Sequence, residues 1–234
     1  MIGVLQIGYH LDEKTYGALY EKYELSKGNQ TKYFSGNAIT EASFLDIAYQ
    51  EWGRICFFGV KLDVNRLYGI TDGLVSSELI EYNSFYALLT KAYVKTFGQE
   101  VTDAILAAEQ NRCDYVEYVT HMKINNAGAL MKKLSAGKFS KEQLDSHSFH
   151  SYRLKSAYVT FTINQLDSDT LRVCAKCPNT VLKRIHKVEG LSGVTIEQVF
   201  DKETAADILF KQIVKYTKPD IPEELSREAI LASL

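Results

Sequence analysis

The stretch from Val75 to Phe97 constrains the fold more than any other part of this sequence. Apolar and aromatic side chains recur there at the spacing of one helical face, which predicts a single long amphipathic helix. The predicted stripe consists of Val75, Leu79, Tyr82, Tyr86, Leu89 and Tyr93. Because such a stripe must be buried against another layer, we expect Tyr82 and Tyr86 to be largely inaccessible, and Glu78 and Lys91 to be exposed.

Segments rich in β-branched and aromatic residues predict the strands of a sheet, which would be the layer that buries this helix. The strands are expected at residues 1–9, 31–34, 43–49, 54–68, 112–119, 152–163 and 170–177. Further helices are expected at 13–25, 125–137, 180–190 and 195–216. Asp12 is predicted to cap the first of these helices, Gly190 to follow the third as its C′ residue, and Pro222 to open a last helix.

These elements predict an α+β protein, in which an antiparallel sheet is flanked by helices and the C-terminal third, residues 179–234, is helical. No Pro- or Gly-rich linker divides the chain, so residues 1–234 are expected to form one domain. The apolar fraction of 46% is typical of a globular protein of this length. The order β-α-β-β-β-α followed by β-α-β-β-α suggests two related halves, 1–100 and 110–190.

The net charge of −2 excludes a strongly basic surface over the whole molecule, although a local basic patch remains possible. The best cluster for phosphate contact contains Lys183, Arg184 and Lys187 on a predicted helix, Lys176 just before it, and Arg153 and Lys155 on a nearby strand. A solvated helix face is the more common cause of such a cluster. The apolar runs are too short to span a bilayer, and the N-terminus does not resemble a signal peptide. We therefore expect a cytoplasmic protein with no membrane partner.

The four cysteines include a CxxC pair, Cys174 and Cys177, which is half of a zinc site. No second CxxC pair is present, and alternation along a strand would place these two thiols on opposite faces. We therefore predict that the cysteines are reduced and bind no zinc. The same argument, applied to the segment 112–119, predicts that Asp114 and Glu117 lie on opposite faces of their strand.

The segment "HSFHSY", residues 147–152, contains the residue types of a tyrosine-dependent DNA nickase. Imidazoles hold a divalent metal, and a phenol attacks the phosphodiester to form a phosphotyrosine bond. In this hypothesis Tyr152 is the nucleophile, and Asp114 with His147 or His150 holds Mg²⁺ or Mn²⁺. The two histidines are three residues apart, a spacing that separates them on a strand, and a solvated polar loop is the simpler interpretation.

The segments "GVLQIGYHLDEKTY", "NRCDYVEYV", "SYRLKSAYVTFTI" and "TLRVCAKC" together resemble phage and plasmid replication proteins of the filamentous-phage gene II and gene X type. The resemblance spans roughly residues 1–217. It consists of a strand with an Arg-x-Asp pattern, here Arg112 to Asp114, then a polar loop, a strand, a strand like Leu-Arg-x-Glu, and helices. It implies a protein that initiates rolling-circle replication by nicking one DNA strand.

Two departures from the family pattern bear on activity. Phe161 stands where the family has its attacking tyrosine, and Cys174 stands where it has the glutamate of Leu-Arg-x-Glu. Two functions therefore remain open. The first is a replication-initiator-like DNA-binding protein, which would nick DNA only if Tyr152 replaced the lost nucleophile. The second is a catalytically inactive relative that acts by binding a host or phage protein.

Overall fold

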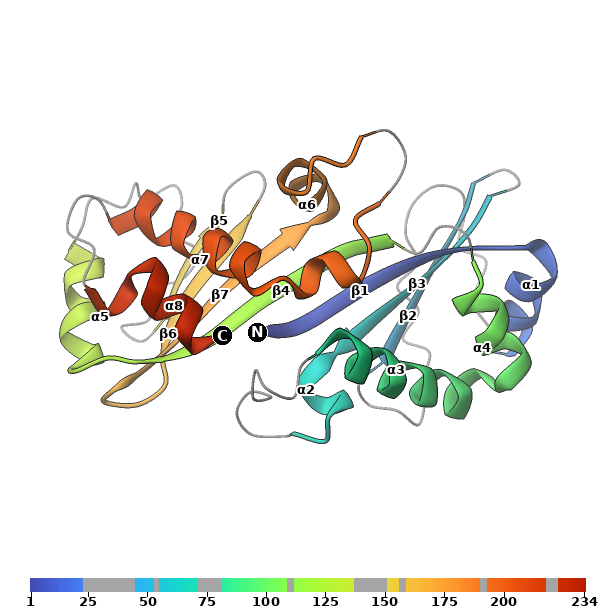
Figure 1. The fold of residues 1–234 in the computed structure, drawn as a ribbon, viewed down its shortest axis with the longest axis horizontal. Helices are drawn as coiled ribbons and strands as arrows, with labels where there is room; N and C mark the ends of the chain where they lie inside the picture. The colour runs from blue at the N-terminus through green and yellow to red at the C-terminus, as the bar shows by residue number, and fades with distance from the viewer. Residues whose placement is uncertain are drawn as a thin grey trace.

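The computed structural model describes residues 1–22, 45–52, 55–70, 81–108, 112–136, 151–155, 159–189, 193–217 and 223–234. In this part of the chain, a seven-stranded antiparallel sheet has the order β2-β3-β1-β4-β7-β6-β5. Helices flank the sheet, and the C-terminal region is largely helical (Figure 1). The predicted α+β class is confirmed.

The strands are β1 (Ile2–Leu11), β2 (Leu45–Trp52), β3 (Ile55–Asp63), β4 (Arg112–Lys123), β5 (Ser151–Lys155), β6 (Thr160–Gln165) and β7 (Thr170–Pro178). The α-helices are α1 (Glu13–Lys22), α2 (Val64–Leu67), α3 (Tyr82–Phe97), α4 (Gln99–Leu106), α5 (Ala127–Ala136), α6 (Asn179–Ile185), α7 (Lys202–Thr217) and α8 (Arg227–Ser233). Two 3₁₀ helices, η2 (Glu197–Phe200) and η3 (Glu223–Leu225), precede α7 and α8.

The strand order divides the sheet into two halves that share one pattern of connections. In the first half, β1 is followed by α1, β2 and β3 and lies beside β3; in the second, β4 is followed by α5, β5, β6 and β7 and lies beside β7, so the second half has one more described strand. A short helix, α2 or α6, directly follows the last of these strands, and a helix of 16 residues, α3 or α7, comes later. The halves meet where β1 pairs antiparallel with β4. This arrangement is a pseudo-twofold, with α1 and α5 at opposite ends of the molecule (Figure 1).

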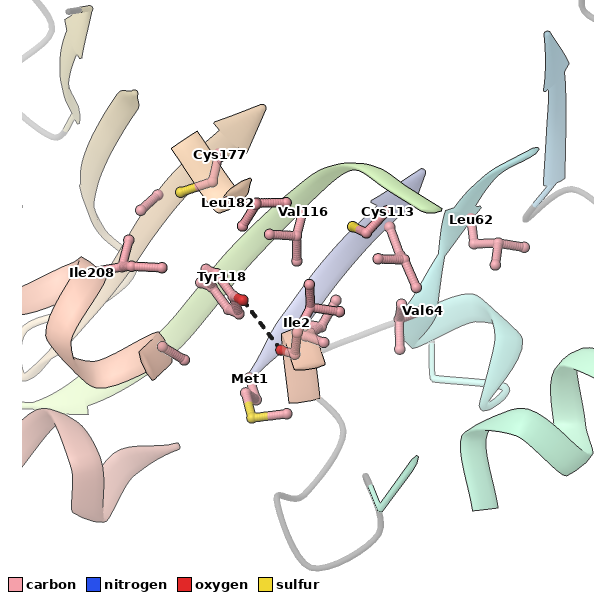
Figure 2. Packing of buried hydrophobic residues seen from close by; sticks show 14 of the residues in the cluster. Met1, Ile2, Leu62, Val64, Cys113, Val116, Tyr118, Cys177, Leu182 and Ile208 are labelled. Carbon is pink, nitrogen blue, oxygen red and sulfur yellow. Dashed lines mark hydrogen bonds between the residues drawn. The ribbon is translucent and has the colours of Figure 1, made fainter. Parts of the chain in front are cut away.

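One face of the sheet carries the hydrophobic core. The strand residues buried in it alternate along each strand, except where the register of β1 and β4 shifts. They are Ile2, Leu5, Ile7, Tyr9 and Leu11 on β1, Phe58, Val60 and Leu62 on β3, Cys113, Val116, Tyr118 and Met122 on β4, Phe161 and Ile163 on β6, and Leu171, Val173, Ala175 and Cys177 on β7. Side chains from α1, α3, α4, α5, α6 and α7 belong to the same cluster. Figure 2 shows its centre beside β1 and β4, where the Tyr118 hydroxyl donates to the Val199 carbonyl at 3.2 Å.

The buried stripe of α3 differs from the predicted one. Phe85, Leu89, Tyr93 and Phe97 are buried, whereas Tyr82 and Tyr86 are only half-buried, so the expected burial of these two tyrosines is wrong. Lys91 is exposed, as expected, and Val75, Glu78 and Leu79 lie outside the described residues. The stripe is set by tertiary contacts: the Tyr93 hydroxyl lies 2.8 Å from that of Tyr9 in β1. Tyr82 instead packs on the border of the core, against the ring of Phe200.

The segment 152–163, predicted as one strand, folds back on itself. β5 and β6 pair antiparallel from Ser151 opposite Asn164 to Lys155 opposite Thr160. The expectation of one continuous strand is therefore wrong. The predicted strand at 31–34 and residues 147–150 of the segment interpreted as a polar loop lie outside the described residues.

Two of the three predicted helix boundaries can be compared with the structure. Asp12 caps α1, since its carboxylate accepts from the Thr15 backbone N–H at 2.8 Å. Gly190 is not the C′ residue of α6: Lys187 takes the left-handed conformation there, with φ of 54°, and the Val188 N–H donates to the Lys183 carbonyl at 2.9 Å. Pro222 lies outside the described residues, and the last α-helix, α8, begins at Arg227.

Candidate functional site

The sheet face opposite the core, here called the open face, is lined mainly by polar side chains. It includes Val4, Gln6, Gly8 and His10 on β1, Lys61 on β3, Arg112, Asp114, Tyr115, Glu117, Val119, His121 and Lys123 on β4, Arg172, Cys174 and Lys176 on β7, and Thr160, Thr162 and Asn164 on β6. Val119 and Cys174 are buried, yet they do not belong to the core cluster. The described helices of eight or more residues all contribute side chains to the core on the other face.

A β-bulge brings two carboxylates to the open face. Cys113 and Val116 both lie in the core, and the register between β1 and β4 shifts between them, so that one extra residue is inserted. Asp114 and Tyr115 consequently both leave the core side, and alternation then places Glu117 on the open face as well. The expectation that Asp114 and Glu117 lie on opposite faces is wrong, because it assumed an unbroken alternation.

Asp114 and Arg112 form an ion pair over the backbone of Gly8. The Arg112 Nε donates to Asp114 Oδ1 at 2.7 Å. A Cβ atom at Gly8 would lie 2.5 Å from Asp114 Oδ2, so only glycine lets the carboxylate lie this close to β1. Burial raises the pKa of the Asp114 carboxyl, and the charge of Arg112 only partly offsets this effect. The ionised carboxylate therefore carries a cost in stability.

Glu117 is the centre of a second cluster, and its side chain is only 8% exposed. Its carboxylate lies 3.4 Å from Arg172 Nη2 and 3.4 Å from Lys176 Nζ, from the neighbouring strand β7. The Tyr115 hydroxyl donates to the same carboxylate at 3.4 Å. Two cations thus surround one anion, and both cations remain more than one-third exposed. This cluster carries a surplus positive charge toward the solvent side of the sheet.

Burial favours the neutral forms of three further titratable groups on the open face, Tyr115, Cys174 and His121. Burial, and then the charge of Glu117, raise the pKa of the Tyr115 phenol far above its usual range. The same two causes, in the same order, raise the pKa of the Cys174 thiol. Burial, and then the charge of Arg172, lower the pKa of His121. Tyr115 and Cys174 therefore offer hydrogen-bonding groups on the described part of the open face, and neither is activated as an ionised nucleophile.

The structure does not bring Tyr152 and Asp114 together. Tyr152 pairs with Ile163, which pairs with Val173, which pairs with Thr120, so β5 is three strands away from β4. Asp114 lies near the other end of β4 from Thr120. At about 4.8 Å per strand and 3.3 Å per residue, the two backbone positions are roughly 20 Å apart or more. One metal-bound phosphate cannot be shared by residues so far apart.

The other predicted site residues also lie apart from this cluster. His147 and His150 are outside the described residues. Arg153 and Lys155 are on β5, in register with Thr162 and Thr160. In the part of the chain that the structure describes, no three His, Cys, Asp or Glu residues are grouped so that they could hold a metal ion.

The predicted basic cluster of the C-terminal region lies on and just after α6. Lys183 and Arg184 are in the last turn of this helix, and Lys187 follows it. Val181 and Leu182 of the same helix are buried in the core. The cluster therefore belongs to the helix-covered side of the sheet, and it forms a surface separate from the open face.

The two positions that depart from the replication-protein pattern lie on different faces. Phe161 is 1% exposed and belongs to the core, whereas Cys174 is outside the core cluster, beside Glu117. Cys177 is in the core, so the predicted separation of Cys174 and Cys177 across their strand is confirmed.

No protein-family model, curated protein or solved structure matches this chain. The fold and the site therefore define its class: an α+β protein whose antiparallel sheet has a helix-covered face and a polar face with a surplus of cations around Glu117. None of the helices in the described ranges is both long and apolar enough to cross a membrane.

Proposed function

We propose that this protein binds single-stranded DNA on the open face of its sheet, as a replication-initiator-like protein of phage or plasmid origin. The observation that carries the proposal is the bulge at Asp114 and Tyr115. It gathers a phenol, two carboxylates and their cations on one face of the sheet. Because Arg172 and Lys176 outnumber the single carboxylate between them, they can contact phosphate groups.

The shape of this face favours a single strand over a duplex. The major groove of DNA is about 12 Å wide and admits a helix or a two-stranded ribbon, whereas a sheet of this many strands is far wider. Single strands bind on sheet surfaces where cations follow the backbone and aromatic rings stack on bases. Tyr115 is a half-buried aromatic residue whose hydroxyl donates to Glu117, the carboxylate that Arg172 and Lys176 also contact.

The chemistry of the open face supports binding more than strand cleavage. The phenol of Tyr115 is protonated, Tyr152 is remote from Asp114, and the family nucleophile position is occupied by the buried Phe161. Asp114 and Glu117 are both already engaged by cations. This combination matches a protein that kept a DNA-binding sheet without the nicking reaction.

The decisive experiment compares two matched pairs of basic residues. A fluorescein-labelled oligothymidylate is titrated with protein over a range of KCl concentrations, and anisotropy is recorded. The variant Arg172→Gln/Lys176→Gln should bind more weakly by about 2 kcal/mol, and its log–log salt slope should fall by about two. The control, Lys183→Gln/Arg184→Gln, also removes one arginine and one lysine, but from α6, and should bind like the unmodified protein.

Other results would reject the proposal in distinct ways. If only the α6 variant loses affinity, the basic helix is the DNA interface and the open face is not. If the unmodified protein does not bind the oligonucleotide, the alternative of a protein-binding relative is favoured. Incubation with supercoiled DNA and magnesium or manganese tests cleavage directly. A covalent adduct would refute binding without nicking, and the variants Tyr115→Phe and Tyr152→Phe would then identify the nucleophile.

A further inference from the structure

The pseudo-twofold relates Glu117 to Gln6. Each central strand carries one extra residue near its start, Gly3 in β1 and Asp114 in β4, where the β1–β4 register shifts. Past these bulges the core residues correspond in order, Leu5 with Val116 and Ile7 with Tyr118. The open-face residue between them is Gln6 in β1 and Glu117 in β4.

The neighbouring strands agree with this correspondence. Gln6 lies opposite Lys61 of β3, and Glu117 lies opposite Lys176 of β7. The molecule thus contains two versions of one arrangement, a lysine facing an uncharged amide and a lysine facing a carboxylate. Since glutamine and glutamate have nearly the same shape, the fold accommodates either side chain at this place in the sheet.

In the arrangement that contains a carboxylate, Glu117 reduces the net positive charge that a ligand would meet. The Glu117 carboxylate lies 3.4 Å from both Arg172 and Lys176 and occupies the space between them. These separations are longer than those of close charge-assisted hydrogen bonds, so neither cation is held tightly. A phosphate that approaches Arg172 and Lys176 meets the repulsion of a nearby carboxylate that is itself almost inaccessible to water.

We propose that Glu117 is an internal counter-anion that limits the affinity of the open face for phosphate. It keeps Arg172 and Lys176 compensated in the unbound protein, and a bound strand must share both cations with it. This inference rests on the proposed function, and it adds a residue that sets the strength and the salt dependence of binding. Its consequence is that removal of a negative charge from the centre of the site, with no change in shape, strengthens binding.

The test is Glu117→Gln in the full chain, with labelled oligothymidylate and a labelled polyphosphate as separate probes. We expect affinity for both probes to rise by about fivefold, with a steeper salt dependence, because two cations become available to phosphate. The matched control is Glu203→Gln on α7, which makes the same charge change and also removes a carboxylate from an arginine, Arg227. This control should change affinity by less than about twofold. Thermal unfolding of both variants verifies that they are folded.

Each result of this binding test supports or contradicts the role proposed for Glu117. Unchanged binding of a folded Glu117→Gln variant would overturn it, and weaker binding would show that Glu117 contacts the ligand or orients its cations. An equal gain from Glu203→Gln would mean that net charge alone is responsible. If the unmodified protein binds neither probe but the Glu117→Gln variant binds polyphosphate, the proposed DNA function fails while the role of Glu117 is upheld. If no protein binds either probe, both proposals are wrong.

Discussion

At the scale of single residues, β4 shows what the sequence could and could not predict. The composition of residues 112–119 correctly predicts a strand, and alternation in 170–177 correctly separates Cys174 from Cys177. The same alternation fails for Asp114 and Glu117, because the extra residue in β4 arises from its register with β1. Register between strands distant in sequence is a tertiary property that local patterns do not encode. The sequence alone therefore could not predict that Asp114, Tyr115 and Glu117 lie on the same face of the sheet.

Asp114 gives a prediction about pH. Burial raises its pKa in the folded protein, so the native state binds this proton more tightly than the unfolded chain. The stability that this proton contributes is fully present below the unfolded pKa, near pH 4, and is lost as the pH rises through the raised pKa. Asp114→Asn removes the charge, so we expect the variant to be more stable than the unmodified protein at neutral pH. Its advantage should shrink as the pH falls toward about 4.

Urea unfolding of both proteins at several pH values measures this difference. A variant that is less stable at neutral pH would show that the ion pair with Arg112 outweighs the cost of burial. If the expected gain is found, the protein retains a destabilising carboxylate on its open face, as is typical of functional residues.

At the scale of elements, segments with a strong local signal were predicted well and segments shaped by neighbours were not. Strand β1 and the Asp12 cap need only local chemistry. The β5–β6 hairpin was missed because "YRLKSAYVTFTI" contains no glycine, proline, asparagine or aspartate to indicate a turn. The stripe of α3 was predicted correctly at Leu89 and Tyr93 and wrongly at Tyr82 and Tyr86, because contacts with the sheet decide which face is buried.

The contact between β4 and the segment that precedes η2 gives a prediction about a glycine. A Cβ atom at Gly193 would lie 2.0 Å from the Cβ of Arg112 and 3.1 Å from its Cα. Backbone cannot move aside as a flexible side chain can. Gly193→Ala should therefore weaken the bridge in which the Cys113 N–H donates to the Val194 carbonyl at 2.7 Å. We expect a loss of about 1–3 kcal/mol in the free energy of unfolding.

Gly17→Ala is the matched control, since nothing lies within 4 Å of a Cβ atom at this position in α1. This variant should gain about 0.5–1 kcal/mol, because alanine loses less entropy than glycine when a helix forms. Both changes are measured by urea denaturation. Equal effects of the two substitutions would contradict the close approach at Gly193.

At the scale of the whole molecule, the order of predicted elements suggested two related halves. On each side of the β1–β4 pair, the last strand of a half lies beside its first strand, but the second half has one more described strand, β5. The corresponding residues differ chemically, as Gln6 and Glu117 do, so residue identity alone does not reveal the relation. The halves are also joined outside the sheet. The ring of Phe200 lies 4.8 Å from Phe85 and 6.0 Å from Tyr82, which links η2 to α3.

These connections predict that the two halves unfold together. The single tryptophan, Trp52, is in β2 of the first half, so its fluorescence reports on that half, whereas far-UV circular dichroism reports on both. Leu182→Ala removes a fully buried side chain from α6 in the second half and should cost about 2–4 kcal/mol. Because Ile2–Gly8 of β1 pair with Arg112–Tyr118 of β4, this loss should move the Trp52 transition and the dichroism transition to the same lower urea concentration. Leu89→Ala in α3, which belongs to the first half, should likewise move the Trp52 transition and the dichroism transition to one lower urea concentration. A Trp52 transition that stays in place while the dichroism curve shifts would show that the halves fold independently, despite their continuous sheet.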